Sequence, residues 1–236
     1  MRKIPIALPC LGKEEAKAAY DTILSGWVTQ GPKVAEFETK FAEYVGSKYA
    51  VAMDSCTNAI FMCARYLRKR QMWKKVRIDL PKQIYVSVPQ ALWHLGYWLH
   101  FEDIKWKGCY PIKPLNIIDS ACRFTQDMYI PNTYYCISFH HRKILSTVRG
   151  GMVLTDDKDF VDWLRPRIYM GRNKDVMSKD DNVSIVDAYN MYMPPEVAME
   201  GLLKFRELPM DNQDCGDSNM YQDISGLNWT RTVYDD

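Results

Sequence analysis

The sequence lacks the cysteine patterns that mark a disulfide-linked or zinc-bound fold. Its seven cysteines are an odd number, lie scattered along the chain and include no Cys-x-x-Cys pair. Neither a disulfide framework nor a cysteine-based zinc site is therefore indicated, and we predict no metal site. The N-terminus has no secretory signal. We expect reduced thiols and a cytoplasmic protein.

The chain also lacks a strong charge of either sign. Lysine and arginine number 31 against 29 acidic residues, a formal net charge of +2. This balance gives no electrostatic reason to bind nucleic acid or an anionic membrane surface. The densest basic cluster, Arg65 to Lys75, follows an apolar helical segment. A solvated helix end explains it better than a binding patch, and no nucleic-acid module accompanies it.

No hydrophobic run has the character of a membrane span. The stretch from Gln83 to Phe101 contains no formally charged residue, but Pro89 and His94 are among the residues that interrupt it. A strand at Gln83–Ser87 followed by a buried helix explains this stretch better. We also find no internal repeat and no low-complexity tract.

What the sequence does contain is an alternation of helical and strand-like segments. Apolar residues recur at helical spacing in 13–24, 32–45, 56–67, 89–97, 157–165 and 196–205, and short apolar runs at 49–53, 98–101, 116–119, 134–137 and 152–154 predict strands. Such alternation is typical of an α/β domain with a mostly parallel sheet covered on both faces. Ligands bind such sheets beyond the C-terminal strand ends, where Thr57, Tyr85, Asp119 and Ser138 fall.

Two of these loops have the composition of a reactive site. The turn Ser55–Asn58 joins a strand to a helix N-terminus, where backbone N–H groups and the helix dipole attract anions. A plain capping turn with Ser55 or Thr57 as the cap is the alternative. Lys143 lies between two strands, and a partly desolvated lysine there would be an amine nucleophile. A solvated loop lysine is the alternative.

Together, an anion cradle, a lysine, an aromatic ring and a carboxylate form the set that pyridoxal phosphate requires. At this point the sequence resembles the DegT/DnrJ/StrS family of sugar aminotransferases. The resemblance rests on motifs in one order: Leu24–Pro32, Phe37-Glu38, Ser55-x-Thr57, Asp119-Ser120-Ala121, Ser138-Phe139, Lys143, Gly150-Gly151 and Tyr189-Asn190. It implies the large domain of the aspartate aminotransferase fold (pyridoxal phosphate fold type I) over residues 1–205, with a short C-terminal tail at 206–236.

The resemblance also implies roles for individual residues. Lys143 would form a Schiff base with the cofactor, and Asp119 would pair with its pyridine nitrogen. Tyr85 would stack on the ring, and a phosphate site would come from Ser55, Thr57, Asn58 and Ser138. Asn190 would reach the phosphate in a partner subunit, so that a homodimer shares its active sites. Residues in the position of substrate contacts are Trp27, Thr29, Gln30, His140 and His141.

The chain also departs from the family pattern. It lacks much of the segment between Lys69 and Asp119 and nearly all of the C-terminal small domain. Cys56 and Cys122 replace residues that are usually glycine and glutamine or histidine, Arg149 stands in an altered glycine motif, and Tyr192 replaces an arginine. These changes affect substrate-facing parts more than cofactor-facing parts.

The expected function is transfer of an amino group, usually from glutamate, to a keto carbon of a nucleotide-activated deoxysugar. Dehydration of a nucleotide sugar is a related reaction, but in the family it accompanies loss of the lysine. A non-catalytic homologue that binds the cofactor or a sugar nucleotide, as a sensor or assembly subunit, is the alternative.

Overall fold

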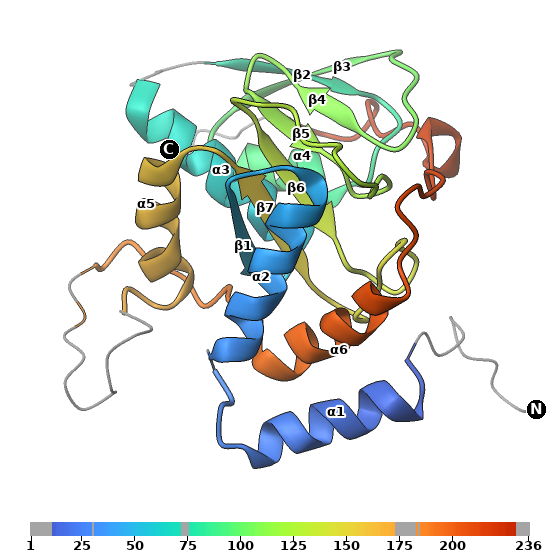
Figure 1. Cartoon of the computed structure of the whole chain (residues 1–236). Coiled ribbons are helices and arrows are strands. Elements are labelled where there is room, and N and C mark those ends of the chain that lie inside the picture. Colours follow the sequence, from blue (N-terminus) through green and yellow to red (C-terminus); the bar gives the residue numbers. More distant parts are fainter. Residues whose placement is uncertain (1–10, 30, 72–75, 173–182, 184, 230–236) are drawn as a thin grey trace, which may run out of the picture.

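The computed structural model describes residues 11–29, 31–71, 76–172, 183 and 185–229 (Figure 1). Its helices are α1 (Lys13–Leu24), α2 (Pro32–Val45), α3 (Cys56–Gln71), α4 (Ser87–His94), α5 (Lys158–Ile168) and α6 (Pro195–Arg206), with a short 3-10 turn at Ser218–Met220. Its strands are β1 (Tyr49–Met53), β2 (Arg77–Pro81), β3 (Trp98–Glu102), β4 (Tyr110–Ile112), β5 (Ile117–Asp119), β6 (Tyr134–Ser138) and β7 (Gly151–Thr155). No helix in these ranges is long and apolar enough to cross a membrane.

Local sequence signals determine where the helices begin and end. Pro32 is the first residue of α2, where its missing N–H costs nothing, and Gly46 ends that helix in the left-handed conformation, at φ 81°. The side chain of Asp157 caps α5 by accepting a hydrogen bond from the Phe160 N–H at 3.0 Å. The predicted helices are therefore present, with ends shifted by a few residues.

The sheet differs from the prediction, because it is mixed rather than mostly parallel. Five strands pair in the order β1-β7-β6-β5-β4, and within them the β5–β6 pair is parallel while the other three pairs are antiparallel. The loops at 139–150 and 113–116 connect β6 to β7 and β4 to β5 without a crossover helix, so each second strand runs back along the first. Strand β4 was not predicted.

A parallel pair, β2 and β3, extends this sheet at its β4 edge. The Asp79 N–H donates to the Lys113 carbonyl at 2.9 Å, which links β2 to the end of β4. The predicted strand at Gln83–Ser87 is wrong. The strand in this region is β2, where Ile78 and Leu80 are buried, and residues 82–86 form the turn that leads into α4.

Helices cover both faces of the five-stranded sheet, and each face has its own apolar core. Because strand side chains alternate between the faces, Val51 and Met53 join the core beneath α3, while Ala50 and Ala52 join the core beneath α2 and α6. Figure 1 shows α2 crossing in front of the strands with α6 below it. Burial on both faces was correctly predicted, and it explains the continuous apolar runs of the strands.

A buried ion pair ties α2 and α5 to the edge strand β1. The Glu38 carboxylate accepts from the Ala52 N–H at 2.8 Å and from the Arg165 guanidinium at 2.8 Å. Arg165 also donates to the carbonyl of Ala50 at 3.2 Å. Glu38 is buried, and these bonds compensate the loss of water around its charge.

The C-terminal segment packs on the domain instead of extending from it. Figure 1 shows residues 207–229 rising from α6 toward the β2–β4 end of the sheet. Along this path the N–H of Ser218 donates to the Trp106 carbonyl at 3.0 Å, and that of Ile224 donates to the Lys82 carbonyl at 3.0 Å. Both Ser218 and Ile224 are buried. The described part of the predicted tail therefore forms part of the same unit.

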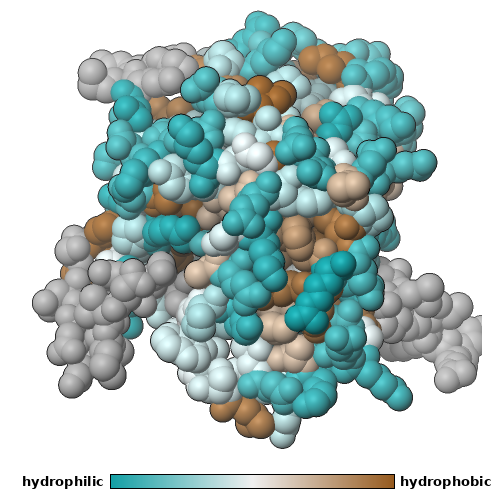
Figure 2. Space-filling view, in the orientation of Figure 1, coloured by the Kyte–Doolittle hydropathy of each residue, from teal (hydrophilic) through white to brown (hydrophobic). Residues whose placement is uncertain are grey.

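Helix α1 packs on α6 and leaves much of its apolar surface uncovered. The exposed apolar residues of this helix and of the loop after it are Tyr20, Ile23, Leu24, Trp27 and Val28. In Figure 2 hydrophobic residues come to the surface at the lower end of the molecule, where Figure 1 places α1. We call these five residues the α1 patch.

Gly151, the first residue of β7, makes the closest backbone contact near the strand ends. A Cβ atom added there would overlap the backbone of Ser55 and Cys56, at the N-terminus of α3. Gly151 also pairs with Ser138, the last residue of β6. The contact therefore holds the end of β6 and its loop against the start of α3.

We expect Gly151→Ala to lower the free energy of unfolding by about 1–3 kcal/mol or more, because the methyl group must displace backbone and not a flexible side chain. Urea unfolding followed by circular dichroism measures the change. Gly226→Ala is the matched control, since a Cβ at Gly226 meets no atom within 4 Å. Equal midpoints for the two variants would contradict the proposed contact.

Candidate active site

A cavity of about 390 Å³ opens where β5 and β6 end and α3 begins. Its wall brings together seven of the residues predicted from the sequence, which come from five different parts of the chain: Ser55, Thr57, Tyr85, Asp119, Ser138, His140 and Lys143. The convergence follows from the topology, since β5 and β6 are parallel neighbours and both end at this edge. The Gly151 contact adds the start of α3.

The turn before α3 combines a cap with polar groups that face the cavity. The Ser55 hydroxyl accepts from the Asn58 N–H at 3.2 Å, so Ser55 caps the helix. Thr57 instead pairs its hydroxyl with that of Ser87 at 2.7 Å, and both residues line the cavity. Ser55 is therefore the cap that the alternative interpretation named, and the anion site stays a prediction, for which Thr57 and the helix dipole are available.

Positive side chains accompany this turn. The guanidinium of Arg149 lies 3.3 Å from the carboxylate of Asp54, which also accepts a hydrogen bond from the side-chain amide of Asn58 at 2.8 Å. Arg149 and Arg142 both belong to the cavity wall. The mouth next to the helix N-terminus is therefore suited to a negatively charged group.

Asp119 supplies a carboxylate at the bottom of the cavity. It is 4% exposed, at the end of β5. The hydroxyl of Tyr110 donates to its Oδ2 at 2.5 Å and the N–H of Ala121 to its Oδ1 at 3.0 Å. Burial raises the pKa of Asp119, while these two hydrogen bonds and the charge of Lys143 oppose the rise. A cationic group in the cavity would be stabilised beside it.

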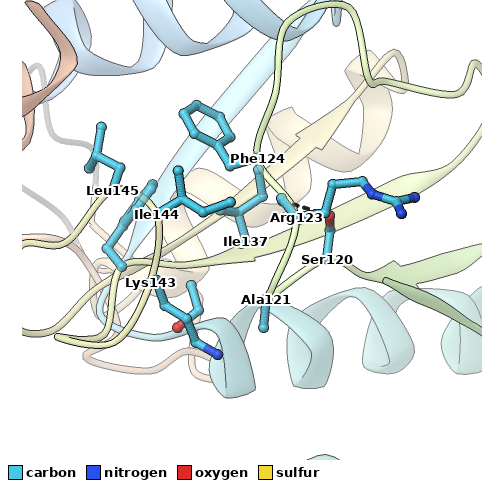
Figure 3. Close-up of a pocket in the computed structure, with 10 residues that line it drawn as sticks. Ser120, Ala121, Arg123, Phe124, Ile137, Lys143, Ile144 and Leu145 are labelled. Atoms are coloured by element: carbon cyan, nitrogen blue, oxygen red, sulfur yellow. Dashed lines mark hydrogen bonds between the residues drawn. The ribbon is translucent and has the colours of Figure 1, made fainter. Parts of the chain in front are cut away.

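Lys143 enters the cavity from the loop between β6 and β7. Figure 3 draws a smaller pocket that shares Ala121, Ser138 and Lys143 with this cavity, and in it the Lys143 amine points away from Phe124, Ile144 and Leu145. The loop is anchored by the Thr147 N–H, which donates to the Phe139 carbonyl at 3.0 Å. The lysine is therefore a positioned residue of the cavity wall and not a solvated loop residue.

The partner of Lys143 is Cys122, which the sequence had marked only as a departure from the family. Lys143 Nζ donates to Cys122 Sγ at 3.2 Å. A hydrogen bond from the Cys215 thiol, together with the charge and hydrogen bond of Lys143, lowers the pKa of Cys122 to about 6 although burial opposes the shift. Near neutral pH Cys122 is therefore a thiolate paired with the lysine. Tyr221 adds a weaker contact at 3.9 Å.

The other predicted residues do not belong to the cavity wall of their own chain. Trp27 is 56% exposed in the α1 patch, and the Thr29 hydroxyl lies 3.0 Å from the hydroxyl of Tyr169. Asn190 is exposed and forms an isolated bridge with Tyr169. Asn58 contributes to the cap, as described above, and Gln30 lies outside the described residues.

The two neighbouring histidines differ in their surroundings. His140 lines the cavity, where burial and the nearby His141, Lys143 and Arg142 lower its pKa, so it is neutral near pH 7. His141 lies outside the wall, and its Nε2 is buried without a hydrogen-bond partner among the described residues.

Several residues of the wall were missed by the sequence analysis. Tyr110 follows a glycine and a cysteine in a segment without clear periodicity, and Ser87 begins a helix. Trp106, Cys215 and Tyr221 reach the wall through long-range packing. No local pattern indicates such contacts, although the aromatic residues of the predicted tail were a signal that it could pack.

The arrangement defines a class of protein: the large domain of the aspartate aminotransferase fold, with a lysine, a buried acid and a helix N-terminus around one cavity. The sequence profile of the DegT/DnrJ/EryC1/StrS aminotransferase family matches residues 9–119 of this chain.

The curated relatives are distant and longer. The spore coat polysaccharide biosynthesis protein SpsC of Bacillus subtilis is 27% identical over 213 residues, which cover 72% of this chain and 54% of SpsC. An uncharacterized protein of Methanocaldococcus jannaschii, MJ1066, is 24% identical over 75% of this chain and 56% of its own length. The chain thus spans about half the length of these relatives.

Solved structures agree on the fold. Helicobacter pylori PseC, an aminotransferase involved in the biosynthesis of pseudoaminic acid, superimposes with a TM-score of 0.67 at 20% identity over 88% of this chain and 66% of PseC. The GDP-4-keto-6-deoxy-D-mannose-3-dehydratase of E. coli gives 0.67 at 19% identity, over 88% of this chain and 68% of its own. Both reactions thus occur on this fold.

We expect the ultraviolet absorbance of the Cys122 thiolate to rise with a midpoint near pH 6, because the pKa of this thiol is lowered to about 6. The difference between wild type and Cys122→Ser, recorded as a function of pH, isolates this signal. Lys143→Met should move the midpoint upward, since it removes a cation next to the sulfur. Cys109→Ser is the control and should leave it unchanged; a wild-type midpoint near 8.5, the usual thiol value, would contradict the pairing.

Proposed function

We propose that this protein is a pyridoxal phosphate-dependent aminotransferase that moves an amino group to a keto carbon of a nucleotide-activated deoxysugar. The observation that carries the proposal is the convergence of Lys143, the buried Asp119 and the N-terminus of α3 on one cavity. The fold and family agree with it. Retention of the lysine favours amino transfer over dehydration, and no observation among the described residues favours a non-catalytic homologue.

The residues of the cavity fit the cofactor. Asp119 is a buried carboxylate that gains a cationic partner if the ring nitrogen is protonated. The α3 N-terminus with Ser55, Thr57 and Ser138 offers N–H and hydroxyl donors for a phosphate, the Asn58 N–H being engaged by the cap. When bound, pyridoxal phosphate supplies an aldehyde that an amine can attack and a ring that accepts electrons. Tyr85 lies at the cavity, 59% exposed, and offers an aromatic face.

Lys143 Nζ is the nucleophile and the base of the proposed reaction. An amine must be unprotonated to act as a nucleophile, and the Cys122 thiolate, 3.2 Å from Nζ, would accept the proton of Lys143. The same Nζ then takes and returns the proton that the substrate carbon exchanges. Tyr110 and the Ala121 N–H orient the Asp119 carboxylate, and their hydrogen bonds favour its charged form against the effect of burial.

The substrate side of the proposal rests on the polar mouth of the cavity. Arg142 and Arg149 can contact the carboxylate of glutamate or the pyrophosphate of a nucleotide sugar. Neutral His140 can accept or donate a hydrogen bond to a sugar hydroxyl. We keep Trp27, Thr29, Gln30 and His141 as proposed substrate contacts, of which Trp27 and Thr29 would act from a partner subunit.

We further propose that the active unit is a homodimer with shared sites. The α1 patch consists of exposed apolar residues of one helix and the loop after it, which a second copy would cover. Asn190 lies on the surface of its own chain, as a residue that serves the partner's phosphate site would. We place the enzyme in the cytoplasm, because the six described cysteines are free thiols.

Wild-type protein with added pyridoxal phosphate should develop a visible absorbance band, which borohydride reduction fixes as a covalent adduct on Lys143. Lys143→Ala should lack both the band and the adduct, because Lys143 provides the amine of the cavity. Lys158→Ala, at a lysine paired with Asp162 on the surface of α5, is the matched control. Peptide mapping locates the adduct.

A band in Lys143→Ala equal to that of wild type would overturn the assignment of the lysine. No band in the wild-type dimer would overturn the proposed function. A band without amino transfer from glutamate to any of a panel of nucleotide keto sugars would leave cofactor binding and reject the reaction.

Two inactive variants test the shared sites. Lys143→Ala and Asn190→Ala should each lose most activity, and refolding them together should restore about a quarter of wild-type activity, because half of the dimers then carry one intact site. Turnover after mixing is the measurement. Full activity of Asn190→Ala alone, or no recovery on mixing, would contradict a site that Asn190 completes from the partner.

A further inference from the structure

Two cysteines from distant parts of the chain meet in the cavity wall beside Lys143. Cys122 follows β5, whereas Cys215 belongs to the C-terminal segment that returns over the domain. The Cys215 N–H donates to the Cys122 carbonyl at 2.9 Å, and both side chains line the cavity. Neither the proposed cofactor site nor the proposed substrate site uses Cys215.

The backbone at this point holds the two cysteines in register. A single N–H to carbonyl bond joins the two residues, which places their Cα atoms near the separation of about 4.4–6.8 Å that a disulfide spans. Gly108 links both segments, since its N–H donates to the Gly216 carbonyl at 2.9 Å and its carbonyl accepts from the Cys122 N–H at 3.1 Å. These backbone hydrogen bonds hold the segments of Cys122 and Cys215 next to each other.

An ion pair between the next residues along the chain reinforces this register. Arg123 follows Cys122, and Asp214 precedes Cys215. The guanidinium binds the carboxylate at two points, Nε to Oδ1 at 2.9 Å and Nη2 to Oδ2 at 2.7 Å. Such paired hydrogen bonds fix orientation as well as distance, and the Asp214 side chain is only 11% exposed.

The two thiols also have the unequal character that disulfide exchange requires. Lys143 and Cys215 stabilise Cys122 as a thiolate, while Cys215 keeps its proton as the donor of the pair. A thiolate with a pKa near ambient pH is an effective attacking group. Both residues line the cavity, and Cys122 is only 3% exposed, so a small oxidant must enter the cavity to meet them.

We propose that Cys122 and Cys215 are a reversible oxidation site, at which a low-molecular-weight disulfide such as oxidised glutathione closes a bond across the cavity wall. The Cys122 thiolate attacks one sulfur of the oxidant, which forms a mixed disulfide and releases one glutathione thiolate. Cys215 then loses its proton and attacks the Cys122 sulfur, which expels the second glutathione. Two protein thiols are oxidised, and one glutathione disulfide is reduced to two thiols.

Formation of the Cys122–Cys215 disulfide removes the Cys122 thiolate that Lys143 contacts. It also links the C-terminal segment covalently to the cavity wall. It therefore changes the surroundings of the amine without altering the lysine itself. The effect on cofactor loading rests on the proposed function, whereas the oxidation chemistry does not, because it involves this chain's thiols alone.

The test uses the full-length protein, reduced, freed of cofactor and then incubated with oxidised glutathione. Remaining thiols are alkylated, and peptides are mapped by mass spectrometry without reduction. We expect a Cys122–Cys215 crosslink as the main product, reversed by dithiothreitol. In Cys215→Ser the reaction should stop at a glutathione adduct on Cys122. Cys109→Ser, at a neighbouring cysteine outside the pair, should crosslink like wild type.

Asp214→Asn tests whether the Arg123–Asp214 ion pair holds Cys122 and Cys215 next to each other. It keeps both thiols and shortens no side chain, but it removes the charge that Arg123 binds. We expect closure of the mixed disulfide to slow severalfold, with little change in the first reaction of Cys122. Circular dichroism of each variant verifies folding.

A wild-type protein in which Cys122 stays unmodified, or in which it joins Cys56 or Cys109 instead of Cys215, would overturn the proposal. The peptide map needs no cofactor. A crosslink in protein that forms no visible band with pyridoxal phosphate would therefore reject the proposed function but not the proposed oxidation site. If the crosslink forms and the protein also binds pyridoxal phosphate, the oxidised protein should develop the visible absorbance band severalfold more slowly than the reduced protein.

Discussion

The site depends on one close backbone contact, in which Gly151 lies directly against Ser55 and Cys56. This contact joins two parts that carry different chemistry: the anion-binding start of α3 and the β6–β7 loop with its lysine. Side chains could not achieve the same approach, since even one methyl group at residue 151 would separate the two backbones. The sheet order supplies the rest, because β7 lies between β1 and β6 and so places their loops side by side.

The charged groups of the cavity lie at two levels. At the bottom, Asp119 has lost its water but keeps hydrogen bonds from Tyr110 and Ala121, so that its charge is oriented and available. Above it, Lys143 faces the thiolate of Cys122. The charge of Lys143 also favours the charged form of Asp119.

Much of this fold and site could be predicted from sequence because the signals were local. The spacing of apolar residues and caps such as Gly46 predicted the helices. Motifs at strand ends predicted seven residues of the cavity wall. The sheet directions were not predictable in the same way, since strand periodicity says nothing about orientation and the short β4 has three residues. Tyr110, Cys215 and Tyr221 were missed because they reach the site through tertiary packing, which no spacing encodes.

The return of the C-terminal segment also has a consequence for biogenesis. Cys215, Met220 and Tyr221 complete a wall whose other residues lie between positions 55 and 150, so this side of the wall comes from a distant part of the chain. During synthesis, when domains form from the N-terminal end, the sheet and α3 can assemble while the wall is still open on that side. The cavity reaches its final shape only after residue 221 has left the ribosome, and a small molecule that needs the finished wall can be retained only from that moment.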